Sequence, residues 1–322
     1  MIDYDYLVKG VNGIGNAHRA GSMAGHLGAA VLAGYYIGED NPDLDSHIYE
    51  GVAGELDRII AGEEGIWFNA AKAGVTPTEL FQSLPSDADS SSKRDSQEAA
   101  RNIAAALVQN IGKTRQSGHN VIFASLAIRA ILDHPEFATN ALISGVRGLT
   151  SSFDTAHAGR GYFGKEKGWL TGNQIELTEP DSKLPPYGSI EDMVSVTVSE
   201  LIATASVKRQ GFGGLWHIIN HAAALVDLHR LGFTDVARKG LPAHRQHIRL
   251  WRMLPDVESE LGRVIQSPLD PFDSAYWQGN LKRDEARLTH RIKTIYGFGR
   301  LVPYLTSAEH SAARLAFRFL MS

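Results

Sequence analysis

One pattern of polar and apolar positions occurs four times along the chain. Each copy has a histidine, an apolar run of helical length, an acidic turn and a second run with helical spacing. The copies begin at His18 (HRAGSMAGHLGAAVLAG), His119 (HNVIFASLAIRAIL), His217 (HIINHAAALVDLHRLG) and His290 (HRIKTIYGFGRLVPYL). The step from histidine to acidic residue is 17, 18 and 19 residues in the last three copies and 25 in the first. This repetition predicts four pairs of helices.

The apolar positions predict that the first helix of each pair is the more deeply buried one. Residues 119–132 are apolar on nearly every side, whereas 136–150 have the three-to-five spacing of an amphipathic helix. Pro42 and Pro135 each precede an acidic residue, and we expect them to start the second helices, where proline and carboxylates are both favoured. Residues 190–207 partly alternate like a strand, but their helical spacing favours a helix.

These elements predict an all-α fold, with repeated antiparallel helix pairs forming an α/α toroid-like or curved solenoid array. Irregular connections are expected near 84–97, which is polar, and near 155–189, which is rich in glycine and proline. A connection as long as the second is often functional, for example as a lid. No clean boundary divides the chain, so we expect residues 1–322 to form a single repeat-built domain.

The composition excludes several kinds of binding partner and several kinds of active site. The chain is 43% hydrophobic and 21% charged with a net charge of −4, so it has no general attraction for nucleic acid. No apolar segment reaches the roughly 18–20 residues of a membrane span. The absence of cysteine excludes thiolate nucleophiles and cysteine metal sites. The N-terminal MIDYDYLVKG lacks the apolar core of a secretory signal, and we expect a cytoplasmic protein with a small-molecule substrate.

The repeated histidines carry the candidate chemistry. If they occupy equivalent ends of the first helices, they line one central cavity, where imidazole can donate, accept or shuttle a proton. The candidate catalytic histidines are His18, His119, His217 and His290. Residues on the same helices that are expected to contact the substrate are His26, Trp216, His221 and Tyr296.

Two other hypotheses are open. The histidines can each bond within their own helix pair, in a non-catalytic helical repeat protein that binds a partner. Alternatively, the HxxxH spacing of His217 and His221 places both rings on one helical face, as in a metal-dependent hydrolase or lyase. No carboxylate stands at ligand spacing beside them, so no metal ligand is assigned. His244 and His247, among several arginines, are interpreted as the solvated basic face of an outer helix, with an anionic ligand or a subunit contact as the alternative.

Three of these segments resemble the questin oxidase-like family. They are HNVIFASLAIRAIL, GGLWHIINHAAAL and THRIKTIYGFGRL. The first histidine helix is similar more loosely, the order of the four agrees, and the four units to which they belong together cover about half the chain. The resemblance implies an all-helical oxidoreductase that cleaves an aromatic polyketide ring of the anthraquinone type by a Baeyer–Villiger reaction, with NADPH as reductant. It adds Arg129 and Lys293 to the candidate residues.

The chain departs from the family at Leu126 and Ala127, where members often have a second histidine. We therefore expect a relative that acts on another small apolar or aromatic molecule. In this hypothesis one histidine is the general base, and Lys293 or Arg129 stabilises the resulting oxyanion.

Overall fold

The computed structural model describes residues 2–85, 95–177, 184, 186–278 and 287–322. Four helix pairs follow the four predicted units, which confirms a mostly helical fold. They are α2 (Gly25–Glu39) with α3 (Ser46–Ile60), α6 (His119–Asp133) with α7 (Asn140–Ser151), α10 (Gly214–Arg230) with α11 (Thr234–Met253), and α14 (Leu288–Leu301) with α15 (Ser307–Phe317). The remaining helices are α1 (Tyr4–Asn16), α4 (Ala70–Ala73), α5 (Ser96–Val108), α8 (Gly164–Lys167), α9 (Ile190–Thr204), α12 (Glu258–Leu261) and α13 (Ser274–Gln278).

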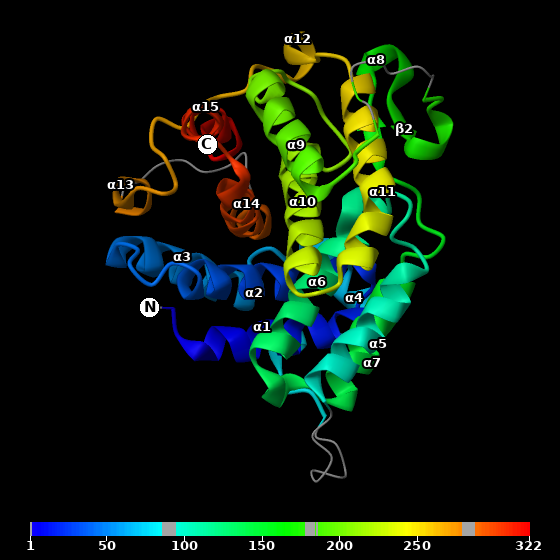
Figure 1. Ribbon diagram of the computed structural model, residues 1–322, viewed down its shortest axis with the longest axis vertical. Coiled ribbons are helices and arrows are strands. Elements are labelled where there is room, and N and C mark those ends of the chain that lie inside the picture. The colour runs from blue at the N-terminus through cyan, green and yellow to red at the C-terminus, as the bar shows by residue number, and fades with distance from the viewer. Residues whose placement is uncertain (1, 86–94, 178–183, 185, 279–286) are drawn as a thin grey trace.

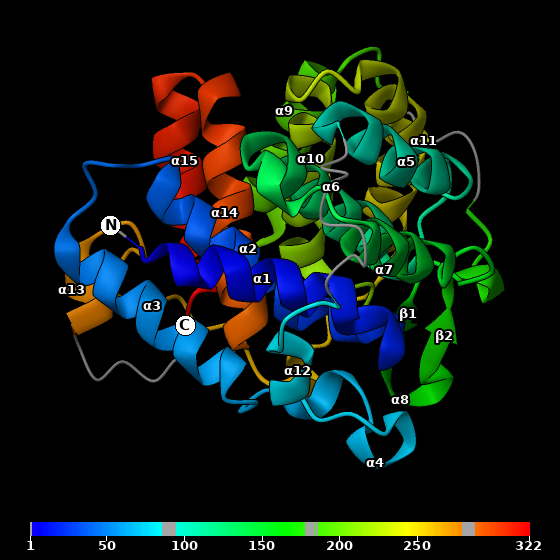
Figure 2. The ribbon, with the colours of Figure 1, turned by 90° about the horizontal axis from the view of Figure 1, so that it is seen from below.

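The first helices of the four pairs form the centre of the molecule. Helix α2 packs against α6 and α14, and α10 packs against the same two helices, so the four inner helices close a ring. In Figure 2, α2 lies between α1 and α14, while Figure 1 shows α9, α10 and α11 side by side. Helix α2 is buried from Gly25 to Gly38, as its apolar run predicts. A toroid-like or solenoid array is not shown by this packing and stays a prediction.

At one end of the ring, a network of charges joins all four inner helices. Arg129 of α6 bonds Asp40 just beyond α2 at 2.6 Å, and Arg300 of α14 bonds Asp227 of α10 at 2.6 Å. Tyr296 links the two halves by accepting from Arg129 and donating to Asp227. Because this is the C-terminal end of each inner helix, the arginines also face the negative ends of the helix dipoles.

The second helices of the first two units begin later than the sequence predicts. Helix α3 begins after Asp45, which accepts from the backbone N–H of His47, and α7 begins after Thr139, which accepts from Leu142. Pro42 lies in the preceding turn, and Pro135 opens a short 3-10 helix. The prediction for these prolines was therefore wrong, because side chains that cap the helix lie several residues further on.

The connections contain more structure than expected. Residues 160–162 (β1) pair antiparallel with 169–171 (β2) inside the stretch 155–189. Of the two predicted irregular stretches, residues 86–94, 178–183 and 185 lie outside the described part of the chain. Residues 190–204 form α9, which confirms the preference for a helix there. Within the described ranges, no helix is both long and apolar enough to cross a membrane.

Close packing of α1 on α2 depends on glycine. A Cβ atom at Gly28 would lie 2.2 Å from the backbone nitrogen of Ile14, a distance that neither helix can accept without moving. Gly54 offers a contrast, because nothing lies within 4 Å of its Cβ position on the exposed side of α3.

We predict that Gly28→Ala destabilises the protein by roughly 1–3 kcal/mol or more, the usual effect of overpacking. Gly54→Ala, the matched control, should be neutral or stabilising by up to about 1 kcal/mol, because alanine is the better helix former. Urea unfolding of both variants measures the difference. Equal stabilities would show that α1 and α2 are not packed this closely.

Candidate functional site

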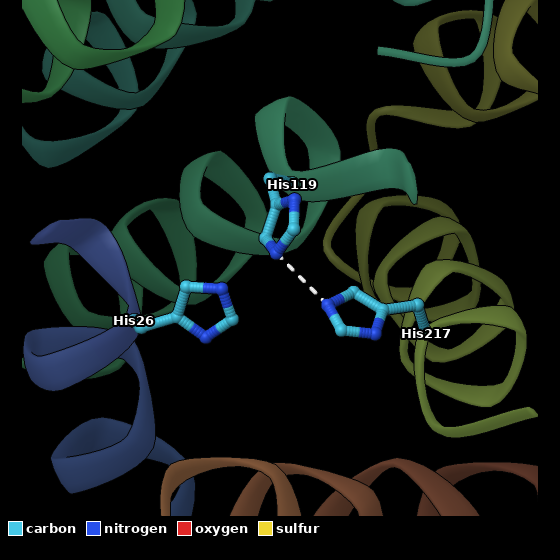
Figure 3. A group of neighbouring side chains, drawn as sticks. All are labelled: His26, His119 and His217. Atoms are coloured by element: carbon cyan, nitrogen blue, oxygen red, sulfur yellow. Dashed lines mark hydrogen bonds between the residues drawn. The ribbon is translucent and has the colours of Figure 1, made fainter. Parts of the chain in front are cut away.

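Four imidazoles meet at the other end of the inner ring, and we call His26, His119, His217 and His290 the histidine cluster. Their helices are α2, α6, α10 and α14, and each histidine lies in the first turn of its helix. His26 is 0% exposed, and His119 and His217 are each 4% exposed. Figure 3 shows these three rings pointing toward one another. One ligand nitrogen of each lies within 4.8 Å of the others. The His290 ring lies 4.7 Å from His217 and 5.1 Å from His26, centroid to centroid.

Unusual backbone turns aim two of these rings. Gln116, Ser117 and Phe212 are the non-glycine residues with positive φ in the described chain, and they lie just before α6 and α10. The β1 segment and the residues before it hold both turns. Ser117 donates to the carbonyl of residue 158 at 2.9 Å, and Phe212 donates to that of residue 160 at 2.7 Å. The long connection thus braces the entrances to α6 and α10.

These turns fix the tautomers of His119 and His217. Nδ1 of His119 bonds the carbonyl oxygen of Gln116, and Nδ1 of His217 bonds that of Gly213 at 2.7 Å. Since a carbonyl only accepts, each Nδ1 carries the proton, and each neutral ring has a lone pair on Nε2. The two Nε2 atoms face each other at 2.9 Å. Two lone pairs at that distance repel unless a proton or a cation lies between them.

His26 is held differently. Its ring stacks on Trp67, with a centroid separation of 3.8 Å, and its Nδ1 lies 2.5 Å from Nζ of Lys293 on α14. Its Nε2 is buried and has no hydrogen-bond partner. Burial lowers the pKa of Lys293 to about 7, although the charge of Glu64 acts in the opposite direction. The lysine therefore exchanges a proton close to neutral pH.

Burial keeps the cluster neutral. It lowers the pKa of all four histidines, and the charge of Lys293 adds to the effect; the pKa of His217 falls to about 3. The positive ends of four helix dipoles point at the same place, which also disfavours imidazolium. Neutral imidazole is the form that binds metal ions.

The donor set fits a transition-metal ion. Nitrogens bound tetrahedrally to an ion such as zinc, at 2.0–2.1 Å from it, are roughly 3.3 Å apart. The observed separations, from 2.9 Å for one pair up to a limit of 4.8 Å, bracket that value. An all-imidazole set suits zinc, copper, iron or nickel rather than magnesium or calcium. His26, His119 and His217 can therefore hold one ion with little movement.

Most of the candidate residues from the sequence lie at this site, and four do not: Arg129, Tyr296, His18 and His221. The ring of Trp216 stacks over His290 with a centroid distance of 6.5 Å. Arg129 and Tyr296 lie at the opposite end of the ring, in the charged network. His18 is exposed in a 3-10 turn after α1, where its Nδ1 bonds the carbonyl of Gly15 at 2.8 Å.

His26 takes the position in the cluster that was predicted for His18. The spacing could have shown this, because the step from His26 to Asp43 is 17 residues, the same as in the second unit.

A second group of histidines was misinterpreted. His244 and His247 are 0% exposed, so they do not form a solvated basic face. Nε2 of His247 bonds the carbonyl of Phe212 at 2.7 Å, and the ring of His221 lies 5.1 Å from that of His244. His221 thus belongs with α11 rather than forming a metal pair with His217.

An open cavity lies beside the cluster rather than at its centre. It has a volume of about 500 Å³ and is lined by the chain before α10, the first turns of α10 and α14, and the C-terminal residues. His290 is part of its wall. Another cavity, of about 280 Å³, borders the charged network at the far end of the ring.

No protein-family model, curated protein or solved structure matches the chain. The residues and their geometry therefore carry the functional argument.

The buried histidines of α11 predict acid sensitivity. Burial lowers the pKa of His247 to about 4, against an ordinary value of 6.5. Below pH 6.5 the unfolded chain binds this proton and the folded chain does not, so stability is complete above pH 6.5 and falls as the pH drops toward 4. Between pH 7.5 and 5.0, this one residue should account for a loss of about 2 kcal/mol in unfolding free energy.

Urea unfolding of wild type and His247→Gln at the two pH values measures the loss of unfolding free energy that is due to His247. The variant should lose less stability on acidification than wild type, and exposed His18→Gln should behave like wild type. Identical pH dependence in wild type and His247→Gln would contradict the assignment.

Proposed function

We propose that this chain is a metal-dependent enzyme, an oxidoreductase that acts on a small apolar or aromatic molecule. One observation carries the proposal. His26, His119 and His217 direct nitrogens to one buried point, and the backbone holds two of those nitrogens unprotonated at 2.9 Å from each other. A bound cation removes the repulsion between them. A structural role for these histidines would leave it in place.

The resemblance to questin oxidase-like proteins supports the oxidoreductase class. Four of the five residues that it implied, namely His119, His217, His290 and Lys293, lie together although they come from three different helices. The fifth, Arg129, lies at the other end of the ring. When bound, a redox-active ion such as iron or copper supplies electron transfer in a site from which bulk water is excluded.

The chain's own residues have distinct roles in this proposal. The carbonyls of Gln116 and Gly213 orient two ligands, and Lys293 in its neutral form orients the third by accepting from Nδ1 of His26. His290 lines the cavity and has a buried Nε2 without a hydrogen-bond partner. Its depressed pKa keeps it neutral, the form that can accept a proton from an acidic substrate hydroxyl.

Metal content tests the proposal. Protein purified without a histidine tag should carry close to one equivalent of a transition metal, or take it up after incubation with Fe²⁺, Zn²⁺ or Co²⁺, measured by elemental analysis. His119→Ala and His217→Ala should lose it, because each removes one of three ligands.

The matched control is His18→Ala, which removes an exposed histidine outside the cluster. A wild-type protein that takes up none of the three ions, or a His119→Ala variant with unchanged metal content, would overturn the metal site. Stoichiometric zinc as the native metal would favour a hydrolase or lyase over an oxidoreductase.

We expect Lys293 to increase the affinity for the metal, although it is not itself a ligand. Lys293→Met removes the neutral amine that accepts from His26 Nδ1 while retaining a long side chain. Above the lysine pKa of about 7 we expect metal affinity to fall about 10- to 100-fold, the usual effect of losing such a partner. Competition with a chelator measures the affinity. Lys239→Met, on the exposed side of α11, should change nothing. Equal affinities in the two variants would remove Lys293 from the site.

A further inference from the structure

The cavity beside His290 has the composition of a binding site for an organic anion. Three cationic residues, Lys208, Arg209 and Arg287, are among its lining residues, and the described lining contains no aspartate or glutamate. The first residues of α10 form another part of the wall, so the positive end of a 17-residue helix faces the cavity. This wall therefore favours an anion over a neutral ligand.

Arg209 has two charged donors that make no hydrogen bond. Its Nε and Nη1 are buried and have no hydrogen-bond partner. A carboxylate oxygen of Glu200 is 3.9 Å from Nη1, close enough for an ion pair but beyond hydrogen-bonding distance. Leaving charged donors without acceptors is unfavourable, and a planar guanidinium matches a carboxylate through two parallel hydrogen bonds.

The rest of the wall is aromatic and apolar. Trp216, Trp251 and Phe319 line the cavity together with Leu215 and Val264. The volume of about 500 Å³ is in the range of small-molecule sites, and flat aromatic walls favour a flat aromatic ligand.

His290 connects the cavity to the histidine cluster. It belongs to the lining and its ring lies 4.7 Å from that of His217. The lining also includes Gly213, whose carbonyl orients His217. A molecule in the cavity therefore lies directly against one member of the cluster and against the backbone that positions another.

We propose that this cavity binds an aromatic carboxylate, with the carboxylate at Arg209 and the ring against Trp216 and Trp251, and that such acids are the substrate class of the enzyme. The substrate assignment rests on the proposed function, whereas binding of the acid does not. The anion also offsets the positive charge that four helix ends and a bound cation place at this end of the ring.

Two probes of nearly equal shape test the charge requirement: 2-naphthoate, an anion, and 2-naphthamide, which is neutral. Titration calorimetry is carried out on chelator-treated protein, and the part of the tryptophan quenching that Trp216→Phe removes reports on the cavity itself. We expect naphthoate to bind at least about tenfold more tightly than the amide, the gain from a charge-assisted pair of hydrogen bonds. Added NaCl should narrow this difference.

Substitution of Arg209 tests whether this residue causes the difference in affinity between the two probes. Arg209→Gln should abolish the preference for naphthoate, Arg209→Lys should keep part of it, and exposed Arg238→Gln should keep all of it. Equal binding of the two probes to wild type, no binding of either, or an unchanged preference in Arg209→Gln would each overturn the proposal. A protein that prefers naphthoate but takes up no metal would overturn the proposed function and leave the anion site standing.

Discussion

Two neutral imidazoles whose lone pairs face each other repel, and the backbone holds His119 and His217 in that arrangement. Their Nδ1 atoms donate to the carbonyls of Gln116 and Gly213, so neither ring can turn its proton toward the other without losing a buried hydrogen bond. Positive-φ residues before α6 and α10 create these carbonyl positions, and β1 braces them. A protein gains nothing in stability from such an arrangement alone. It becomes favourable when a cation shares both lone pairs.

The two ends of the ring of inner helices carry different side chains, and the helix dipoles explain the difference. All four N-terminal ends meet at the histidines, where burial and the helix dipoles keep imidazole neutral. All four C-terminal ends meet at the pairs formed by Arg129 and Arg300 with Asp40 and Asp227, where cations complement the opposite dipole ends. One end therefore gathers neutral imidazoles, and the other holds the helices together through ion pairs. The cationic cavity beside His290 lies at the histidine end.

The sequence predicted the helix pairs and most of the cluster, because a buried helix with a histidine in its first turn leaves a readable pattern. It placed His18 in the first unit, since that histidine opens the segment, although His26 keeps the common spacing of 17 residues. His244 and His247 were assigned to the surface because arginines surround them in sequence, yet those arginines lie on other faces of α11. The ten residues from His119 to Arg129 span about 15 Å of helix, so this spacing could have placed Arg129 at the far end of the ring. Which tautomer a turn selects depends on tertiary contacts that no spacing encodes.

Anomalous X-ray diffraction from crystals grown with one equivalent of Co²⁺ tests the central claim most directly, because it locates the ion rather than counting it. The account predicts a single strong anomalous peak bonded to Nε2 of His119 and His217 and to a ring nitrogen of His26, with those two Nε2 atoms further apart than 2.9 Å. A crystal without a peak among these rings, in which Nε2 of His119 and His217 remain in direct contact, would contradict it.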